Sequence, residues 1–171
     1  SSGGNVAVGD SALKELNYDG NSYNVAIGHN AGLNLTNAAY TTLIGGFTGD
    51  GYDTENHNTA VGYQAFGGSV AGAEYNTAIG SYTLDATTSG DNNTAVGYQA
   101  LTTHTTGTSN TAVGYQAMSA GNITGNYNTA IGVQASNNAT SGQNNTSLGY
   151  SAANDAVYSL TNESYRIVIG N

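Results

Sequence analysis

The chain has 171 residues, of which only 8% are charged, and two basic residues stand against eleven acidic ones for a net charge of −9. Binding to nucleic acid or to an anionic membrane surface depends on clustered Lys and Arg, so the charge disfavours both partners. No Cys is present, which excludes disulfides and thiolate metal sites. No apolar run approaches the roughly 18 residues of a membrane span, so we expect no membrane insertion.

One nine-residue segment, residues 93–101, returns almost unaltered at residues 110–118 and 58–66. Its glycine recurs along the whole chain at intervals of 17 to 21 residues. These glycines are Gly9, Gly28, Gly45, Gly62, Gly80, Gly97, Gly114, Gly132, Gly149 and Gly170. A fixed interval of this kind predicts a solenoid, in which each repeat forms one coil, or rung.

In chain order, we expect a linker at residues 1–4, solenoid repeats at residues 5–152, and a divergent last rung at residues 153–171. The last step, from Gly149 to Gly170, is the longest, and Arg166 replaces the usual Asn there. Neither end shows a capping segment, although an open sheet edge offers unpaired backbone groups. We therefore expect further protein at both ends, as continuing domains or as copies stacked head to tail, with a junction to a missing C-terminal region after residue 171.

Each rung begins with a five-residue segment such as Asn93-Thr94-Ala95-Val96-Gly97. Because side chains alternate along a strand, the second and fourth slots share one face and the third slot faces the other way. The fourth slot is apolar in every rung, which predicts a buried core column. This column is Val8, Ile27, Ile44, Val61, Ile79, Val96, Val113, Ile131, Leu148 and Ile169.

The other slots are equally regular. The second slot is always β-branched and mostly Thr, and the third is mostly Ala, which implies close approach of another layer. Asn fills the first slot in eight of ten rungs, so amide groups are expected to hydrogen-bond up the column. The glycine in the fifth slot is expected to bend the chain, either with a positive φ or pressed against a neighbouring layer.

After the glycine, Tyr-Gln-Ala-Leu in the best copies is interpreted as a second short extended piece. A helix is rejected there because about five residues separate the glycine from the next turn segment, far below the roughly 12 to 15 of a marginal isolated helix. The predicted fold is all-β, a parallel β-solenoid of about ten rungs of 17–18 residues.

The motif Asn-Thr-Ala-Val/Ile-Gly-x-x-Ala resembles the YadA-like head repeats of trimeric autotransporter adhesins, which carry a similar Asn-Ser-Val-Ala-Ile-Gly pattern. The longer version with Tyr-Gln-Ala-Leu is similar to repeats in the shafts of bacteriophage tail-fibre proteins. The resemblance covers residues 5 to about 152. It implies a left-handed β-roll, a homotrimer, and an extracellular location in a virion tail fibre or cell-surface fibre. The ending at residues 166–171 is similar to the junction before an intramolecular chaperone domain.

An assembly is also expected from the strand itself, because both of its faces are uncharged and small or apolar in nearly every rung. The coil can cover one face, so the partner of the other must come from outside the chain. The residues alone do not choose between two and three chains, nor which face meets the partner. The resemblance implies three.

A candidate ligand stripe follows the glycine. It consists of Tyr63, Tyr98, Tyr115 and Tyr150. Aromatic faces stack on sugars, so this stripe or the loop face could recognise a cell-surface glycan; the competing interpretation is that the rings pack on neighbouring rungs. The Thr column raises an ice-binding hypothesis, but it shares a face with the apolar fourth slot, which was interpreted as interior.

No catalytic group stands out, so we expect neither an enzyme nor a cofactor. The three histidines, His29, His57 and His104, occupy different repeat positions and are not expected to form a metal site. The densest acidic cluster, Asp50, Asp53 and Glu55, could ligate Ca²⁺, but its spacing matches no known calcium loop and favours a solvated loop. The leading hypothesis is a structural shaft segment of a trimeric fibre, and the alternative is a carbohydrate-binding module.

Overall fold

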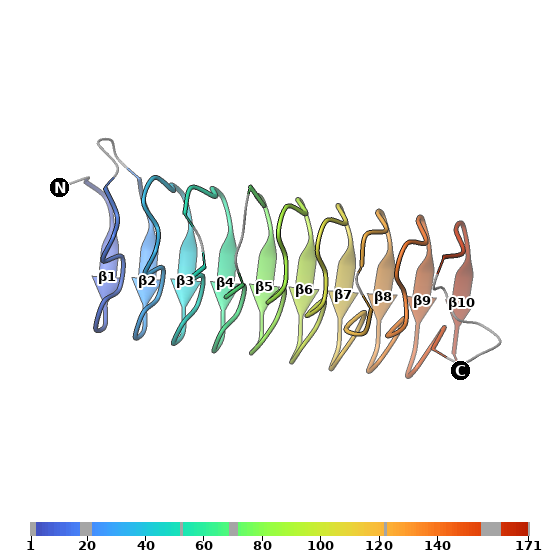
Figure 1. Cartoon of the computed structure of the whole chain (residues 1–171). Helices are drawn as coiled ribbons and strands as arrows, with labels where there is room; N and C mark the ends of the chain where they lie inside the picture. Colours follow the sequence, from blue (N-terminus) through green and yellow to red (C-terminus); the bar gives the residue numbers. More distant parts are fainter. Residues whose placement is uncertain are drawn as a thin grey trace.

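A computed structural model describes residues 3–17, 22–51, 53–68, 72–121, 123–154 and 162–170. Within them the chain forms a rod of stacked coils, with the N-terminus at one end and the C-terminus at the other (Figure 1). Residues 1–2 of the expected linker and residues 155–161 and 171 of the expected last rung lie outside the described residues.

Each coil contributes one strand of three residues, and the described residues contain no helix. The strands are β1 (Val6–Val8), β2 (Val25–Ile27), β3 (Thr42–Ile44), β4 (Thr59–Val61), β5 (Thr77–Ile79), β6 (Thr94–Val96), β7 (Thr111–Val113), β8 (Thr129–Ile131), β9 (Thr146–Leu148) and β10 (Ile167–Ile169). They form one ten-stranded parallel sheet in chain order, which confirms the predicted β-solenoid. Rung n below is the coil that begins with strand βn.

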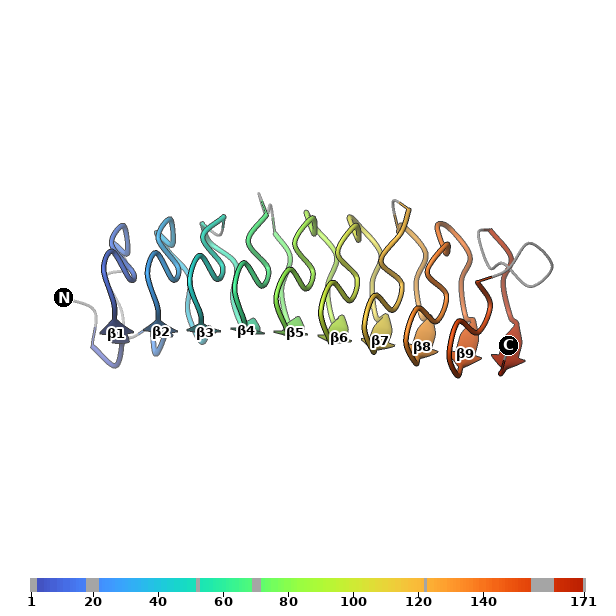
Figure 2. The same ribbon diagram turned by 90° about the horizontal axis from the view of Figure 1, so that it is seen from below.

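The register places every slot on its own counterpart in the next rung. In β6 and β7, for example, Ala95 pairs with Ala112 and Val96 with Val113. The hydrogen-bond ladder continues past both ends of each strand, as in the 2.8 Å bond from Thr94 N–H to the carbonyl of Asn110. Seen at a right angle to the first view, the strands lie on one side of the rod and the turns and loops on the other (Figure 2).

The predicted core column is wrong, because the fourth slot points out of the coil. Seven of its ten residues are 37 to 75% exposed, and Val61, Val96 and Val113 are half-buried. The third slot forms the interior instead, with the side chains of Ala95 and Ala112 fully buried. The alternation of faces was predicted correctly, and the inward face was assigned to the wrong slots.

The reason is the narrow interior of a coil of about 17 residues. The residue four positions after the glycine fills that interior from the turn side, as Phe66, Leu101 and Met118 do, and all three are fully buried. Only a small side chain then fits on the sheet side. The small third-slot residues were expected to pack closely against another layer, and that layer is the turn of the same coil.

Two exceptions to the Ala column support this account. Leu43 replaces Ala in rung 3, and glycines stand at the turn position that faces it, Gly32 in rung 2 and Gly49 in rung 3. A Cβ on Gly49 would lie 2.8 Å from Leu43, and one on Gly32 would lie 2.9 Å from it. In rung 9, Ser147 replaces Ala and hydrogen-bonds to the buried Ser136 hydroxyl at 2.7 Å. Interior volume and polarity are thus matched across the coil.

The segment after each glycine is a series of turns rather than the second extended piece that was expected. In rung 6, Gln99 and Leu101 have φ of 54° and 53°, the left-handed region that side chains disfavour. Their N–H groups still reach neighbouring coils, Gln99 to the carbonyl of Ser81 and Leu101 to that of Ala117, both at 3.0 Å. These bonds between coils offset the cost of the conformation, so each rung has one strand.

The Asn column forms a ladder, but its partners are backbone groups rather than other amides. In rung 6 the Asn93 side-chain oxygen accepts from the N–H of Asn110 at 2.9 Å, and its Nδ2 donates to the carbonyl of Gly107 at 3.0 Å. The same pair of bonds recurs at Asn58, where Asn76 N–H and the Ala73 carbonyl are the partners. Each buried amide therefore joins its strand to the next coil and to its own returning loop.

The fifth-slot glycines show both features that were predicted for them. Gly97 and Gly114 have φ of 134° and 140°. A Cβ on Gly97 would lie closer than 3.0 Å to the carbonyl of Gly114, and a Cβ on Gly114 would collide in the same way with Gly132. The glycines thus stack on one another at a spacing that excludes any side chain.

We expect Gly97→Ala to lower the free energy of unfolding by about 3 kcal/mol or more, because the new Cβ combines a positive φ with a backbone collision. Gly72→Ala is the matched control, since Gly72 has φ 101° but no atom within 4 Å of an added Cβ. That variant should lose only about 1 to 2 kcal/mol. Equal losses for the two variants in urea unfolding would contradict the glycine stack.

Candidate functional site

The main surface feature is the outer face of the sheet, defined here as the second and fourth slots of all ten strands. It is uncharged from β1 to β10. Exposure of the fourth slot is 41% at Ile79 and Ile131 in the middle of the rod and reaches 75% at Ile169 at its end. An exposed apolar strip that runs along a whole face is typical of an interaction site.

Thr forms an unbroken column on the outer face from β3 to β9. The seven residues are Thr42, Thr59, Thr77, Thr94, Thr111, Thr129 and Thr146. In-register pairing places them on consecutive strands, about 4.8 Å apart, beside the column of Val and Ile. The outer face therefore carries two parallel rows, one of Thr side chains and one of aliphatic side chains.

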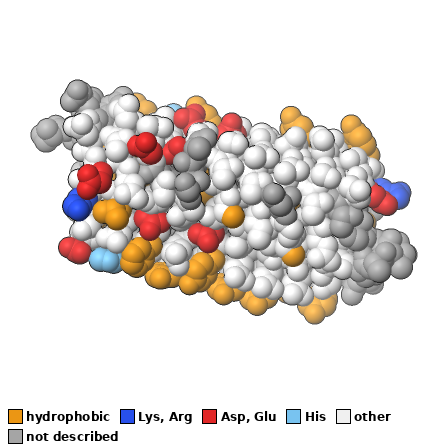
Figure 3. Space-filling model, in the orientation of Figure 1, with side chains coloured by type: hydrophobic (Ala, Val, Ile, Leu, Met, Phe, Trp, Pro, Cys, Tyr) orange, Lys and Arg blue, Asp and Glu red, His pale blue; other side chains and the backbone are white. Residues whose placement is uncertain are grey.

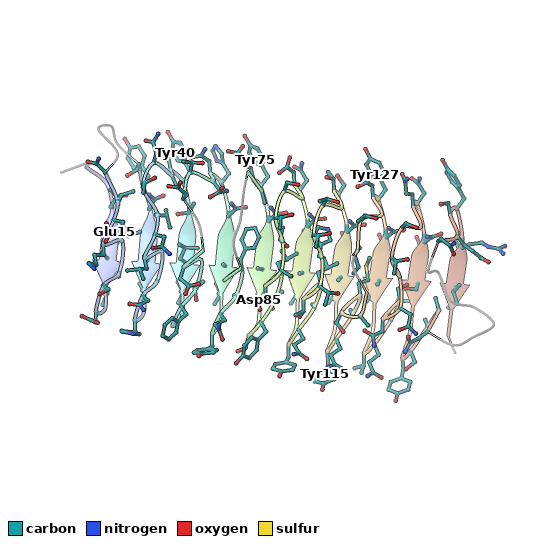
Figure 4. The ribbon with its side chains drawn as sticks, in the orientation of Figure 1. Glu15, Tyr40, Tyr75, Asp85, Tyr115 and Tyr127 are labelled. Carbon is teal, nitrogen blue, oxygen red and sulfur yellow. The ribbon has the colours of Figure 1, made fainter. Side chains whose placement is uncertain are left out.

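Aromatic rings line the edge of the outer face where the strands end. This end-edge row is His29, Phe47, Tyr63, Tyr82, Tyr98 and Tyr115. Successive ring centroids lie 5.1 to 6.1 Å apart, so the rings contact one another from rung to rung. Figure 4 shows Tyr115 projecting from this edge.

The row brings together three of the four predicted stripe residues. Tyr63, Tyr98 and Tyr115 belong to it, while Tyr150 lies two rungs beyond Tyr115, with Val133 in the slot between. Tyr98 and Tyr115 stack face to face at 5.6 Å, and Tyr63 meets its neighbours edge to face. These contacts between rungs are the ones that the packing interpretation expects, and each of the three rings is still 43 to 48% exposed.

A second aromatic row lies at the edge where the strands begin, in the slot before Asn. This start-edge row is Tyr23, Tyr40, His57 and Tyr75. His57 is sandwiched between Tyr40 at 4.9 Å and Tyr75 at 4.8 Å, nearly parallel to both. The three tyrosines are each about half exposed, and Figure 4 shows Tyr40 and Tyr75 projecting outward. The outer face is thus bordered by aromatic rings along both long edges.

Sequence reasoning missed the start-edge row, although the signal was present. The slot before Asn holds Tyr or His in rungs 2 to 5, and Tyr again at Tyr127 and Tyr165. The column comparison that identified the other slots would have found it if it had been extended by one residue.

The three histidines have separate environments. His29 lies 3.3 Å from the Asp10 carboxylate at the N-terminal end of the end-edge row. His57 belongs to the start-edge row. His104 is fully buried in a loop, with Thr87 Oγ1 3.4 Å from its Nδ1 and Asn110 Nδ2 3.5 Å from its Nε2. Burial lowers the pKa of His104 to about 4, against a weaker opposing effect of a hydrogen bond with Gly107.

The carboxylates of the candidate calcium cluster have protein partners. Glu55 is buried and accepts from the N–H groups of Asp53, Thr54 and Gly72 at 2.8 to 3.0 Å. The Asp53 carboxylate accepts from the Thr36 hydroxyl. These bonds tie the loop together, and they account for the carboxylates without a ligand.

Asp50 is not grouped with Asp53 and Glu55. Its carboxylate and that of Asp85 both lie beside Gly67. A Cβ on Gly67 would be 3.2 Å from one carboxylate and 3.3 Å from the other. Burial raises the pKa of both groups, and the charge of Asp85 adds to the shift of Asp50. In the described part of the chain, no three His, Cys, Asp or Glu side chains are grouped so that they could hold a metal ion.

Charge is distributed unevenly along the rod. Residues 92–154 contain no Asp, Glu, Lys or Arg, and no acidic residue lies in a strand. Figure 3 shows most of the acidic side chains of the visible face over its N-terminal half, while hydrophobic side chains lie along its upper and lower edges. The described residues also include no helix long and apolar enough to cross a membrane.

Comparison with known proteins identified no relative: no family model, no curated protein and no solved structure matches the chain.

The buried His104 predicts a pH-dependent stability. Its pKa is about 4 in the folded state against 6.5 for the free side chain, so folding is favoured by the neutral form. This contribution is complete above pH 6.5 and is lost as the pH falls toward 4, at roughly 1.4 kcal/mol per pH unit. Between pH 7 and 4.5 we expect the free energy of unfolding of the parent to fall by roughly 2 kcal/mol more than that of His104→Gln, measured in urea.

His57→Gln, at the exposed edge, is the control for the loss of a histidine side chain. The raised pKa values of Asp50 and Asp85 act in the opposite direction, but they are common to all three proteins and cancel in the comparison. If His104→Gln retains the full loss of stability below pH 6.5, the buried imidazole is not its cause.

Proposed function

We propose that the chain is a structural shaft segment of an extracellular homomeric fibre, in which copies associate through their outer faces with their solenoid axes parallel. The observation that carries this proposal is the outer face itself. It is uncharged along all ten strands, and the chain's own core lies entirely on its other side. Apolar surface of this extent on a soluble protein is typical of an interaction site.

The distribution of charge supports association between copies. A chain with a net charge of −9 repels its own kind, so an interface must exclude the acidic side chains. No strand carries one. Two outer faces can therefore meet without burying a carboxylate, whereas an interface through the loops of rungs 3 to 5 would bring Asp50, Glu74 and Asp85 together with their copies.

The number of copies and the parent assembly rest on the resemblance of the Asn-Thr-Ala-Val/Ile-Gly repeats. Three copies, a left-handed roll, and a phage tail fibre or fibrous adhesin as the source are the proposed details. Closed cyclic symmetry is the usual arrangement of identical chains, and with parallel axes each added rung lengthens the same interface. In such a fibre the segment spaces or presents a receptor-binding end.

The pair Val96→Glu and Val113→Glu tests this function. Both side chains lie half-buried on the outer face, so their charges would be fully buried without partners at the interface but would keep contact with water in a free chain. We expect the parent to be trimeric at micromolar concentration in native mass spectrometry. The double variant should be a folded monomer with parent-like circular dichroism.

Ala95→Glu and Ala112→Glu are the matched control, since they place the same charges one residue away. These residues are fully buried in the coil, so this double variant should lose the fold itself. A well-folded parent monomer at micromolar concentration would refute the proposal, and so would an assembly that survives the Val96→Glu and Val113→Glu pair.

Ice binding is a second candidate, because the structure removes the objection raised against it. The Thr column lies on the outside of the coil, and seven residues of it stand in register on consecutive strands. A regular array of hydroxyl and methyl groups is a surface on which ordered water can be held. Ice binding needs a free outer face, whereas fibre assembly covers it.

Thermal hysteresis measured on the parent separates these two functions. A monomer that halts ice growth, and that loses this activity in Thr94→Leu and Thr111→Leu, would support ice binding. A trimer without hysteresis would support the fibre. Both substitutions lie on the outer face and leave the buried Ala column intact.

Carbohydrate recognition by the Tyr stripe or the loop face is the alternative that the sequence analysis raised. Within the end-edge row the rings contact one another, which leaves outward ring edges and hydroxyl groups for a glycan. Tyr150, 66% exposed, is the most accessible member of the stripe. A glycan array with the parent and Tyr150→Ala tests this alternative.

A further inference from the structure

The outer face by itself is small for a stable interface. Nine spacings of about 4.8 Å and a strand of three residues give a strip of roughly 45 by 10 Å, or about 450 Å² in projection. A specific interface buries about 800 Å² on each partner. An assembly through the outer face therefore needs additional surface, and the aromatic rows are what borders it.

The sheet geometry determines which rows meet. All strands run in the same direction across the rod, so one long edge is the start edge and the other is the end edge. When identical chains surround a common axis with their solenoid axes parallel, rotation brings the start edge of each copy to the end edge of its neighbour. An antiparallel pair of rods with opposed faces would instead bring start edge to start edge.

The positions of the two rows along the rod favour the parallel arrangement in register. The start-edge row occupies rungs 2 to 5, and the end-edge row occupies rungs 2 to 7. In a parallel assembly without axial shift, every ring of the start-edge row faces a rung that carries an end-edge ring. In an antiparallel assembly the start edge of rungs 2 to 5 would face the start edge of rungs 6 to 9, where the slot before Asn is aromatic only at Tyr127.

The chemistry of the rings suits contact between the rows. Rings in the start-edge row stack with their faces on one another, so their edges and polar atoms point outward, and Tyr40 and Tyr75 are 53 and 54% exposed. In the end-edge row several rings are mutually perpendicular, as Tyr63 and Tyr82 are at 71°. Ring edges carry partial positive charge and prefer the faces or hydroxyl oxygens of other rings.

We propose that the start-edge row of one copy packs against the end-edge row of the next, rung against equal rung, and that this aromatic seam sets the parallel register of the assembly. The proposal rests on the proposed function, because it needs the outer faces to be the interface. It adds the partner surface for each edge and the axial alignment of the copies.

Cross-linking through introduced cysteines tests the seam, since the chain has no Cys of its own. His57→Cys and Tyr63→Cys in one chain place a thiol at each edge of rung 4. Within a chain the two thiols are six residues apart across β4, at most about 20 Å, and a cross-link between them would leave the chain at the monomer position on a denaturing gel. We expect this double variant to give covalent dimers and trimers on a denaturing gel. Each single variant should run as a monomer on the same denaturing gel.

Tyr23→Cys with Tyr115→Cys is the matched control. It uses the same two edges but in rungs 2 and 7, which lie about 24 Å apart along the axis. We expect no cross-linking from this pair.

Cross-linking of a single variant to itself would show like edges meeting, and cross-linking of the control pair would show a different register. Either result overturns the seam, as does a double variant that stays uncross-linked while native mass spectrometry shows it assembled. A parent that is monomeric overturns the proposed function and the seam together. An assembled parent together with an assembled double variant that does not cross-link overturns the seam alone.

Discussion

Every part of this protein depends on one constraint, the stacking of each residue on its counterpart in the next coil at the spacing of paired strands. A slot accepts a side chain only if that side chain can lie against another like it. Gly97 stacks on Gly114 because no Cβ fits between them. Asn93 suits its slot because one amide can bond both to the next strand and to its own loop. Flat rings satisfy the same constraint at the edges, where Tyr40, His57 and Tyr75 lie nearly parallel.

This constraint explains which features could be predicted from the sequence. The repeat interval, the strand, the parallel register and the positive φ of the glycines all follow from comparing columns, because stacking makes every column uniform. Which face points inward could not be read from hydrophobicity. The column of Val96 and Val113 is the more apolar, yet the interior has room only for Ala beside Leu101 and Met118. Size was the informative property, since a tightly limited volume keeps a column small.

The candidate site was harder to predict for the same reason. The Tyr98 and Tyr115 stripe was visible as a column, but its geometry was not, because the left-handed turn residues that aim those rings were taken for a strand. The loops around Asp50 and Glu55 vary from rung to rung, and their contacts follow from individual hydrogen bonds rather than from the repeat. Inside the coil the amides of the Asn column hydrogen-bond to the chain's own backbone. Outside the coil the chain presents apolar rows, and this contrast is why its function is sought in association.

The large Leu43 side chain packs against two glycines, and this match has a consequence for how the chain reaches its native strand register. An array of interchangeable coils can slip, so that one coil is left out as a loop and its neighbours pair across the gap. Most columns here would tolerate such a slip, because Ala95, Ala112 and Ala130 are equivalent. Leu43 is not, since only Gly32 and Gly49 leave space for it. A slipped chain would press Leu43 against Phe66 or leave a void beside the two glycines. This irregular match, like that of Ser147 with Ser136, therefore gives a repetitive chain a fixed point that sets which coils pair.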